Sequence, residues 1–255
     1  MTGTLAPSRR LLPARRLGTP PPNATIVART DLGPTMARFS IAPDEGVPAF
    51  APGQYFAIGL ELGGRLVQRP YSAASAAGDA TLEFLVRLVP GGELTPALWS
   101  AGPGRRVRLG PPKGLFRLSE AHDGATLLLG TGTGIAPLVA MARALRGSAR
   151  PTVLVHGVAR VDELAYGEVL ASWAGATADR TYVPAISRPA DDSNAGWRGR
   201  TGRLDAVVPE VLAELELRPA GVMAYLCGSP AMIEGVGASL RELGVPAHAI
   251  RSEAF

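Results

Sequence analysis

The residues from Gly130 to Pro137 have the composition of a loop that holds a phosphate group. Glycines stand at positions 130, 132 and 134, directly after an apolar segment, 125–129, of strand length. Glycine lets the backbone approach a ligand closely, and Pro137 suits the first turn of a helix, where N–H groups are free to bind an anion. The loop is therefore a candidate cradle for a pyrophosphate. Its spacing differs from the dinucleotide fingerprint G-x-G-x-x-G, so an ordinary turn between strand and helix is the alternative.

A second group of reactive side chains is Arg69-Pro70-Tyr71-Ser72. A guanidinium can bind a phosphate with two hydrogen bonds, a tyrosine face can cover a flat heteroaromatic ring, and a hydroxyl can bond a ring nitrogen. On a strand, Arg69 and Tyr71 share one face, while Ser72 points to the other unless the chain turns. The alternative is a barrel strand that ends in a proline turn.

Gly91, Gly92 and Thr95 form a third candidate, a glycine turn that leads into a short helix. The Thr95 hydroxyl would donate to a phosphate there. A simple hairpin turn accounts for the same residues equally well.

Metal and disulfide chemistry are not expected. Cys227 is the only cysteine, which excludes an internal disulfide and a cysteine-ligated iron–sulfur cluster within the chain. The three histidines, at 122, 156 and 248, lack the spacing of metal ligands.

Composition limits the partners. The 255 residues allow one large domain or two of ordinary size, and 46% of them are hydrophobic, enough for a core in each half. The net charge of +4 suits an acidic partner; the arginines form no cluster that predicts nucleic-acid binding. No apolar run approaches the ~20 residues of a membrane span, and the N-terminus lacks a secretory signal, so we expect a cytoplasmic protein with no integral membrane segment. Residues 1–22 are expected to be a disordered basic tail.

The first half, residues 23–118, predicts a small antiparallel β-barrel. Short segments with alternating apolar and polar side chains are separated by glycine and proline turns. The expected strands are 24–29, 36–42, 54–60, 65–72, 81–89 and 105–109, with a short helix at 95–100.

The second half, residues 119–255, predicts an α/β domain with a parallel sheet, because strands and helices alternate. The expected strands are 125–129, 152–156, 181–186 and 222–226, and the expected helices are 137–146, 162–172 with Asp162 as N-cap, 204–216 and 231–243. The segment 249–255 closes the chain. Ligands of such sheets bind beyond the carboxyl ends of the strands. The glycine loop, Ser187-Arg188 and Cys227-Gly228 all lie at such ends.

Taken together, these motifs resemble the ferredoxin–NADP reductase family over residues 24–255. The resemblance rests on eight motifs in the family's order: Arg69–Ser72, Gly91–Thr95, Gly130–Pro137, Val153–Gly157 with Glu163–Tyr166, Ser187-Arg188, Thr201–Arg203, Cys227–Pro230 and Glu253–Phe255. It implies an FAD-binding barrel followed by an NADP-binding α/β domain.

The resemblance also implies roles for individual residues. Arg69 would bind the FAD pyrophosphate, Tyr71 would stack on the isoalloxazine ring, and Phe255 would cover the opposite face and move aside for the nicotinamide. The remaining FAD contacts would be Pro70, Ser72, Gly91, Gly92 and Thr95. The NADP contacts would be Gly132, Thr133, Gly134, Ser187, Arg188, Arg203, Cys227 and Gly228. The catalytic residues would be Ser72, Cys227, Glu253 and Phe255, with Glu253 relaying protons or bonding near Ser72.

Two departures concern the nucleotide. Relatives with a similar His-Gly-Val segment carry an arginine where this chain has Ala159, with Arg160 next, and Pro189 replaces an acid that often follows the Ser-Arg pair. Ser187, Arg188 and Arg203 still offer donors to a 2′-phosphate. No acid is expected at the end of the strand that contains His156, where an NAD site would hold the ribose. NADP is therefore favoured, with NAD as the alternative.

The implied function is hydride exchange between NADP(H) and FAD, followed by transfer of single electrons to or from ferredoxin or flavodoxin. Such carriers are usually acidic, and Arg105, Arg106 and the tail arginines are candidate contacts. One alternative is the reductase subunit of an oxygenase or another multicomponent enzyme. Another is a flavoprotein sensor or binding module that does not turn over.

Overall fold

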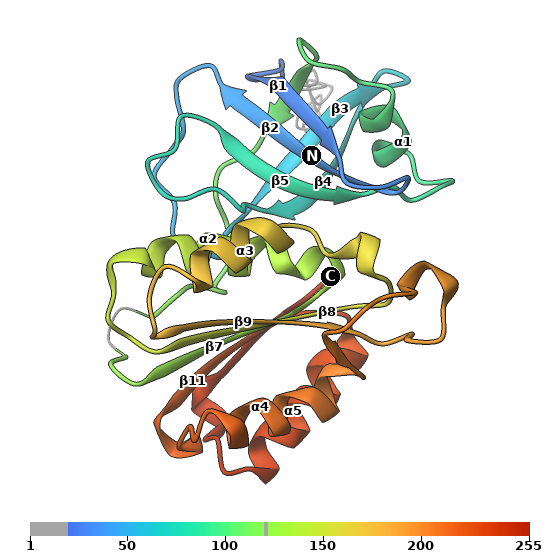
Figure 1. The fold of residues 1–255 in the computed structure, drawn as a ribbon. Helices are drawn as coiled ribbons and strands as arrows, with labels where there is room; N and C mark the ends of the chain where they lie inside the picture. The colour runs from blue at the N-terminus through green and yellow to red at the C-terminus, as the bar shows by residue number, and fades with distance from the viewer. Residues whose placement is uncertain (1–19, 120–121) are drawn as a thin grey trace, which may run out of the picture.

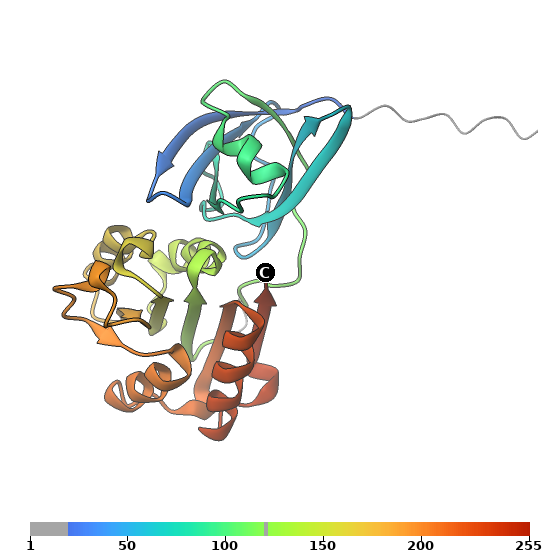
Figure 2. The ribbon, with the colours of Figure 1, turned by 90° about the vertical axis from the view of Figure 1, so that its right-hand side faces the viewer.

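The structure, a computed structural model, describes residues 20–119 and 122–255. They form two domains, one above the other in Figure 1, joined by a single chain segment that Figure 2 shows passing beside the C-terminus. Apart from residues 20–22, the expected N-terminal tail lies outside the described residues. Within the described ranges, the helices are too short or too polar to cross a membrane.

The first domain is the expected antiparallel barrel. Its strands are β1 (Ala24–Asp31), β2 (Met36–Pro43), β3 (Tyr55–Leu62), β4 (Arg65–Ser72), β5 (Leu82–Arg87) and β6 (Arg106–Leu109). They follow the order β4-β3-β6-β1-β2-β5, and a bridge between Ala73 and Phe84 brings the two edges together. Phe39, Phe56 and Phe84 are at most 1% exposed and fill the interior. A short helix, α1 (Leu94–Trp99), follows β5.

The second domain is the expected α/β domain, with every strand parallel. The strands are β7 (Ala125–Thr131), β8 (Thr152–Val158), β9 (Arg180–Ile186), β10 (Arg200–Thr201), β11 (Val222–Gly228) and β12 (Ile250–Ala254). Their order is β10-β9-β8-β7-β11-β12. The central strands are buried on both faces, which explains their almost continuous apolar sequences.

Helices cover both faces of this sheet. The helices α2 (Ile135–Ala144) and α3 (Gly167–Ala174) lie between the sheet and the barrel, whereas α4 (Leu204–Glu214) and α5 (Pro230–Glu242) cover the far face (Figure 1). Pro137 lies in the first turn of α2, as its missing N–H favours.

One expected helix is wrong. A continuous helix over 162–172 with Asp162 as N-cap is not formed. The segment Val161–Glu163 is a 3-10 turn, and α3 begins only at Gly167. Tyr166 has φ of 64°, a left-handed conformation that a right-handed helix cannot continue through.

The two domains are tied together by a charged cluster. Glu83 on β5 lies 3.4 Å from Arg38 on β2 and 3.1 Å from Arg143 on α2, with 17% of the Glu83 side chain and 19% of the Arg143 side chain exposed. Arg143 also donates to the carbonyl of Ala74, at 2.7 Å. The ring of Tyr166 lies about 6 Å from both guanidinium groups. These contacts fix α2 against the barrel.

Candidate active site

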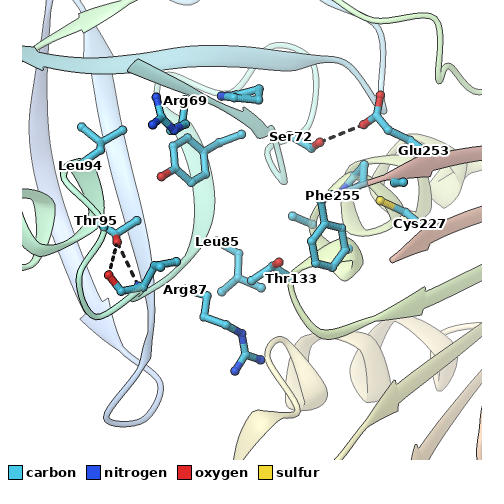
Figure 3. Close-up of a pocket in the computed structure, with 18 of the residues that line it drawn as sticks. Arg69, Ser72, Leu85, Arg87, Leu94, Thr95, Thr133, Cys227, Glu253 and Phe255 are labelled. Carbon is cyan, nitrogen blue, oxygen red and sulfur yellow. Dashed lines mark hydrogen bonds between the residues drawn. The ribbon is translucent and has the colours of Figure 1, made fainter. Parts of the chain in front are cut away.

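Between the domains lies a cleft of about 480 Å³, here called the interdomain cleft (Figure 3). The barrel contributes Arg69, Pro70, Tyr71, Ser72, Leu85, Arg87, Val89, Gly92, Glu93, Leu94 and Thr95. The α/β domain contributes Thr133, Gly134, Ala136, Pro137, Cys227, Glu253, Ala254 and Phe255. The structure thus brings residues of five sequence motifs to one place.

The barrel side of this cleft combines a cation with an aromatic face. Arg69 is exposed, and its Nη1 donates to the carbonyl of Gln68 at 2.8 Å. Tyr71 packs partly against the barrel core, and burial raises the pKa of its phenol to about 12. The phenol is therefore neutral at physiological pH, and its ring offers an apolar surface to a flat ligand.

Ser72 and Glu253 meet across the cleft. The Ser72 hydroxyl donates to Oε1 of Glu253 at 3.3 Å, although the residues are 181 positions apart. Burial raises the pKa of Glu253, and the bond from Ser72 partly offsets this rise. The carboxyl group therefore holds its proton at a higher pH than a solvated glutamate does, which suits a group that moves protons.

Cys227 lies beside Glu253 because β11 and β12 are neighbours in the sheet, with these two residues in register. Its side chain is 3% exposed, and burial, together with the Glu253 carboxylate, raises the pKa of the thiol. The thiol is neutral at physiological pH, so it offers a weak hydrogen bond rather than a nucleophile.

Phe255 lies over the glycine loop. Its backbone N–H reaches the carbonyl of Gly228 at 3.4 Å, while its side chain is 63% exposed. Gly134 makes this arrangement possible, because a Cβ there would lie 2.3 Å from the carbonyl oxygen of Cys227 and 2.8 Å from Cε1 of Phe255. Any larger residue at Gly134 would displace the strand end or the ring.

A second cleft of about 190 Å³ lies beyond the carboxyl ends of β7, β8 and β9, and is called the nucleotide cleft below. Its lining consists of Thr131, Gly132, Gly157, Val158, Ala159, Glu163, Ser187, Gly202, Arg203, Leu204, Asp205, Ser229, Met232 and Val236. Ser187 donates to the carbonyl of Val158 at 3.2 Å, and Arg203 is 64% exposed, 3.5 Å from Asp205.

Sequence comparisons identify the family of this chain. Residues 23–118 match the family of oxidoreductase FAD-binding domains, and residues 128–237 match that of oxidoreductase NAD-binding domains. Ferredoxin–NADP reductase B of Sorangium cellulosum is 32% identical over 246 residues, which cover 92% of this chain and 98% of that protein. The chain belongs to the ferredoxin–NADP reductase family. It is a member of a family of flavin-dependent oxidoreductases that also bind a nicotinamide nucleotide.

Two further relatives are named as reductases that serve oxygenating enzymes. The reductase component of the naphthalene 1,2-dioxygenase system of Pseudomonas putida is 32% identical over 81% of this chain, which spans 60% of that protein's length. The solved structure of an Amycolatopsis cytochrome P450 reductase has a TM-score of 0.81 and 30% identity, covering 92% of this chain and 69% of that one.

The interdomain cleft fits a flavin. A flat ring system needs apolar faces, which Tyr71 and Phe255 provide, and a pyrophosphate needs a cation, which Arg69 provides. The nearby hydroxyl of Ser72 can exchange hydrogen bonds with ring nitrogens.

The position of Glu163 shows that one expectation was wrong, namely that no acid stands at the end of the strand that contains His156. An acid does stand at the end of β8, the strand of His156, because the 3-10 turn folds Glu163 back to it. Oε2 accepts the N–H of Ala159 at 3.2 Å, and Oε1 accepts from Arg160 at 3.0 Å. The Arg160 guanidinium is therefore paired with a carboxylate.

Arg87 is a residue that the sequence analysis missed. It lines the interdomain cleft from β5, and its Nη1 lies 3.7 Å from Oε1 of Glu163 in the nucleotide cleft. Arg87 therefore stands between the two clefts. The alternation along β5 could have indicated it, since Leu85 and Arg87 share one face of the strand and both line the cleft.

Some of the expected contact residues do not line the two clefts. Gly91, Arg188 and Gly228 line neither cleft among the described residues. The Arg188 carbonyl accepts from the side chain of Asn194 at 2.7 Å. Thr95 does line the interdomain cleft, but its hydroxyl accepts the N–H of Val89 at 3.0 Å and lies 3.3 Å from the Val89 carbonyl. That hydroxyl thus stabilises its own turn.

Within the described ranges, no three His, Cys, Asp or Glu side chains gather in a way that could hold a metal ion. His156 is fully buried inside β8, and burial lowers the pKa of its imidazole to about 4. It is therefore a neutral core residue.

Proposed function

We propose that this chain exchanges a hydride between NADP(H) and FAD and passes electrons singly to a protein carrier. The observation that carries the proposal is the contact of Ser72, from the barrel, with Glu253, from the α/β domain, beside Cys227. This contact lies where ligands held by the two domains would meet. FAD, when bound, supplies the redox chemistry, and the protein supplies binding and orientation.

The roles of the side chains follow from their positions in the interdomain cleft. Arg69 binds the FAD pyrophosphate, and Tyr71 and Phe255 cover opposite faces of the flavin ring. Because the Phe255 side chain is 63% exposed at the end of β12, it can move without disturbing the core. Ser72 and Glu253 hold hydrogen bonds and a proton at the ring edge.

The glycine loop and the nucleotide cleft hold the nicotinamide nucleotide. Gly132, Thr133 and Gly134 bind its pyrophosphate at the N-terminal end of α2. Arg203 faces the nucleotide cleft and supplies a positive charge to a 2′-phosphate, and Ser187 supplies a donor when its hydroxyl turns away from the Val158 carbonyl. We therefore place NADP(H) first, with NAD(H) as a second substrate that Glu163 makes acceptable.

The proposed electron carrier is a ferredoxin, or a flavodoxin, and the proposed location is the cytoplasm. Two observations support an acidic carrier: the net charge of +4, and the names of relatives such as ferredoxin–NADP reductase B of Sorangium cellulosum.

The direct test is anaerobic stopped-flow mixing of the purified, FAD-loaded protein with NADPH and, separately, with NADH. We expect the yellow protein to bleach, faster with NADPH than with NADH. A protein that refuses FAD in reconstitution, or whose flavin is not reduced by either nucleotide, would contradict the proposed function. The second result would favour a sensor or binding module instead.

A second candidate is the reductase subunit of an oxygenase. The relative from the naphthalene 1,2-dioxygenase system favours it. The chemistry in the cleft would be the same, and only the acceptor would differ. Co-purification from the native host, followed by reduction assays with the recovered carrier and oxygenase, separates the two.

A further inference from the structure

We propose that four residues beside the interdomain cleft, Lys113, Leu115, Arg117 and Arg251, form the docking surface for an acidic protein that carries single electrons. They are called the linker surface below. The inference deepens the proposed function, on which it rests, by assigning the place where the carrier binds.

Leu115 is the most exposed large hydrophobic residue among those described. Its relative exposure is 89%, compared with 63% for Phe255. Single exposed apolar side chains are common on protein surfaces, so exposure alone assigns no function. The function is inferred from the anchored backbone around Leu115, from the positive charges beside it and from its position at the interdomain cleft.

The backbone around Leu115 is held firmly. Lys113 and Tyr55 exchange two backbone hydrogen bonds, of 2.9 and 3.0 Å. On the other side of Leu115, Phe116 is 5% exposed and packs edge-on against Tyr225, with 6.0 Å between ring centroids. Leu115 therefore points outward from an anchored segment and can bind a partner with little loss of conformational entropy.

The charges of Lys113, Arg117 and Arg251 are positive, and no acid among the described residues pairs with them. Arg117 donates to the carbonyl of Gly114 at 3.0 Å, and Arg251 donates to the carbonyl of Arg117 at 3.0 Å. Within residues 20–119 and 122–255, none of the ion pairs below 4.0 Å involves Lys113, Arg117 or Arg251. Binding to carbonyl groups orients these guanidinium groups but leaves their charge, which attracts an acidic protein.

Arg106, which the sequence analysis gave as a candidate contact for the carrier, differs because its charge is paired. Its guanidinium forms two hydrogen bonds of 2.5 Å with the carboxylate of Asp44. That charge is already paired, and Arg105 precedes β6, at the end of the strand away from Lys113, so the sequence-based expectations for both arginines are replaced here by the linker surface.

The linker surface adjoins the interdomain cleft. A Cβ at Gly114 would lie 3.7 Å from Oε2 of Glu253, which lines the interdomain cleft. In Figure 2 the linker passes beside the C-terminal end of the chain. A protein seated on Leu115 would therefore lie against the edge of the cleft. Electron-transfer complexes bury small interfaces, below about 1,200 Å², for which one apolar contact within a cationic surround is suitable.

The test compares Lys113→Glu, Leu115→Ser and the control Arg105→Glu in the full-length, FAD-loaded protein. Arg105 is exposed and precedes β6, whereas Lys113 follows it, so the control makes the same charge change at the opposite end of the strand. The probe is a purified acidic [2Fe–2S] ferredoxin. Its affinity is measured by calorimetry, and its reduction by NADPH is measured beside that of ferricyanide.

We expect Lys113→Glu to weaken ferredoxin binding and kcat/KM about five- to tenfold at low ionic strength, with the effect shrinking as salt is added. Leu115→Ser should weaken both about threefold at every ionic strength, since its contact is apolar. Ferricyanide reduction should remain unchanged in all variants, and Arg105→Glu should stay close to the unmodified protein.

Three results would overturn the inference. One is ferredoxin binding that neither Lys113→Glu nor Leu115→Ser weakens. Another is an equal loss in Arg105→Glu, which would indicate a response to net charge alone. The third is a dimer that Leu115→Ser dissolves, which would assign the surface to a second copy of the chain. Because calorimetry requires no turnover, ferredoxin binding is distinguishable from a failure of flavin reduction, which would refute the proposed hydride exchange.

Discussion

Replacing Glu163 by glutamine should shift the choice between the two nicotinamide nucleotides toward NADPH. In the structure, Oε1 of Glu163 accepts from Arg160 at 3.0 Å and lies 3.7 Å from Arg87. Glutamine can still accept the N–H of Ala159, so the turn is preserved while the negative charge is removed. Arg160 then keeps its 3.5 Å contact with Asp162 but loses its charged partner at position 163, so it can turn toward a 2′-phosphate, and a repulsive charge has left the nucleotide cleft.

The magnitude follows from the hydrogen bond that is released. A charge-assisted hydrogen bond contributes about 1.5–3 kcal/mol. The Arg160 side chain is 35% exposed, so solvent screening reduces the gain, here taken as about half, or roughly 0.7–1.4 kcal/mol. Since about 1.4 kcal/mol corresponds to a factor of ten, the ratio of kcat/KM for NADPH to that for NADH should rise about three- to tenfold.

The ratio of the two kcat/KM values is informative because NADPH and NADH have the same pyrophosphate and differ only in the 2′-phosphate. Any change at Arg87, which lies near the glycine loop, affects both substrates and cancels. Steady-state reduction of ferricyanide with each nucleotide gives the two kcat/KM values. The matched control is Glu168→Gln, an exposed acid in the first turn of α3 outside both clefts. An unchanged or reduced ratio in Glu163→Gln would refute the reasoning, as would an equal rise in the control.

Three further predictions concern the interdomain cleft. Arg69→Ala should weaken FAD binding about 10- to 100-fold through loss of charge-assisted hydrogen bonds; unchanged FAD occupancy after gel filtration would contradict the pyrophosphate contact. Ser72→Ala removes the hydrogen bond that lowers the pKa of Glu253, so this pKa should rise further and the acidic limb of the flavin-reduction rate, measured by stopped flow, should move to higher pH; a limb that stays in place would show that Glu253 does not control it. Gly134→Ala should raise KM for both nucleotides at least tenfold, because the new Cβ would lie 2.3 Å from the carbonyl of Cys227; a KM that stays within twofold would mean that the loop can shift freely.

The domain architecture could be predicted because each half follows one simple periodicity. Alternation of side chains in segments such as Met36–Ala42 specifies half-buried antiparallel strands, and the apolar run Ala125–Leu129 specifies a strand buried on both faces. The motifs at the strand ends then had to meet at one edge of the parallel sheet.

The features that sequence could not supply depend on three-dimensional geometry. Glu163 reaches the end of β8 because Val161–Glu163 forms a 3-10 turn, and the helix α3 begins only after Tyr166, whose conformation is left-handed. In contrast, the position of Arg87 could have been predicted from the sequence, because every second residue of a strand points to the same face and Leu85 lines the cleft.

The pairing of Gly91, Arg188 and Gly228 with ligands could not be decided from sequence either. A glycine in a motif can serve packing as well as binding. At Gly228, a Cβ would lie 2.3 Å from Oγ1 of Thr131 and 2.4 Å from Cε of Met232, so close packing already requires a residue without a side chain.

The charged cluster around Glu83 limits how this protein can be recombined. A domain with its own hydrophobic core can in principle fold alone, which is the premise of domain exchange. Here Arg143 of α2 donates both to Glu83 and to the carbonyl of Ala74, so half of the cluster belongs to each unit. A chimera that replaces the barrel would leave the largely buried Arg143 guanidinium without its carboxylate, and one that replaces the α/β domain would leave Glu83 with Arg38 but without Arg143. A working chimera must therefore carry Arg143 and Glu83 together, even though they lie in different domains.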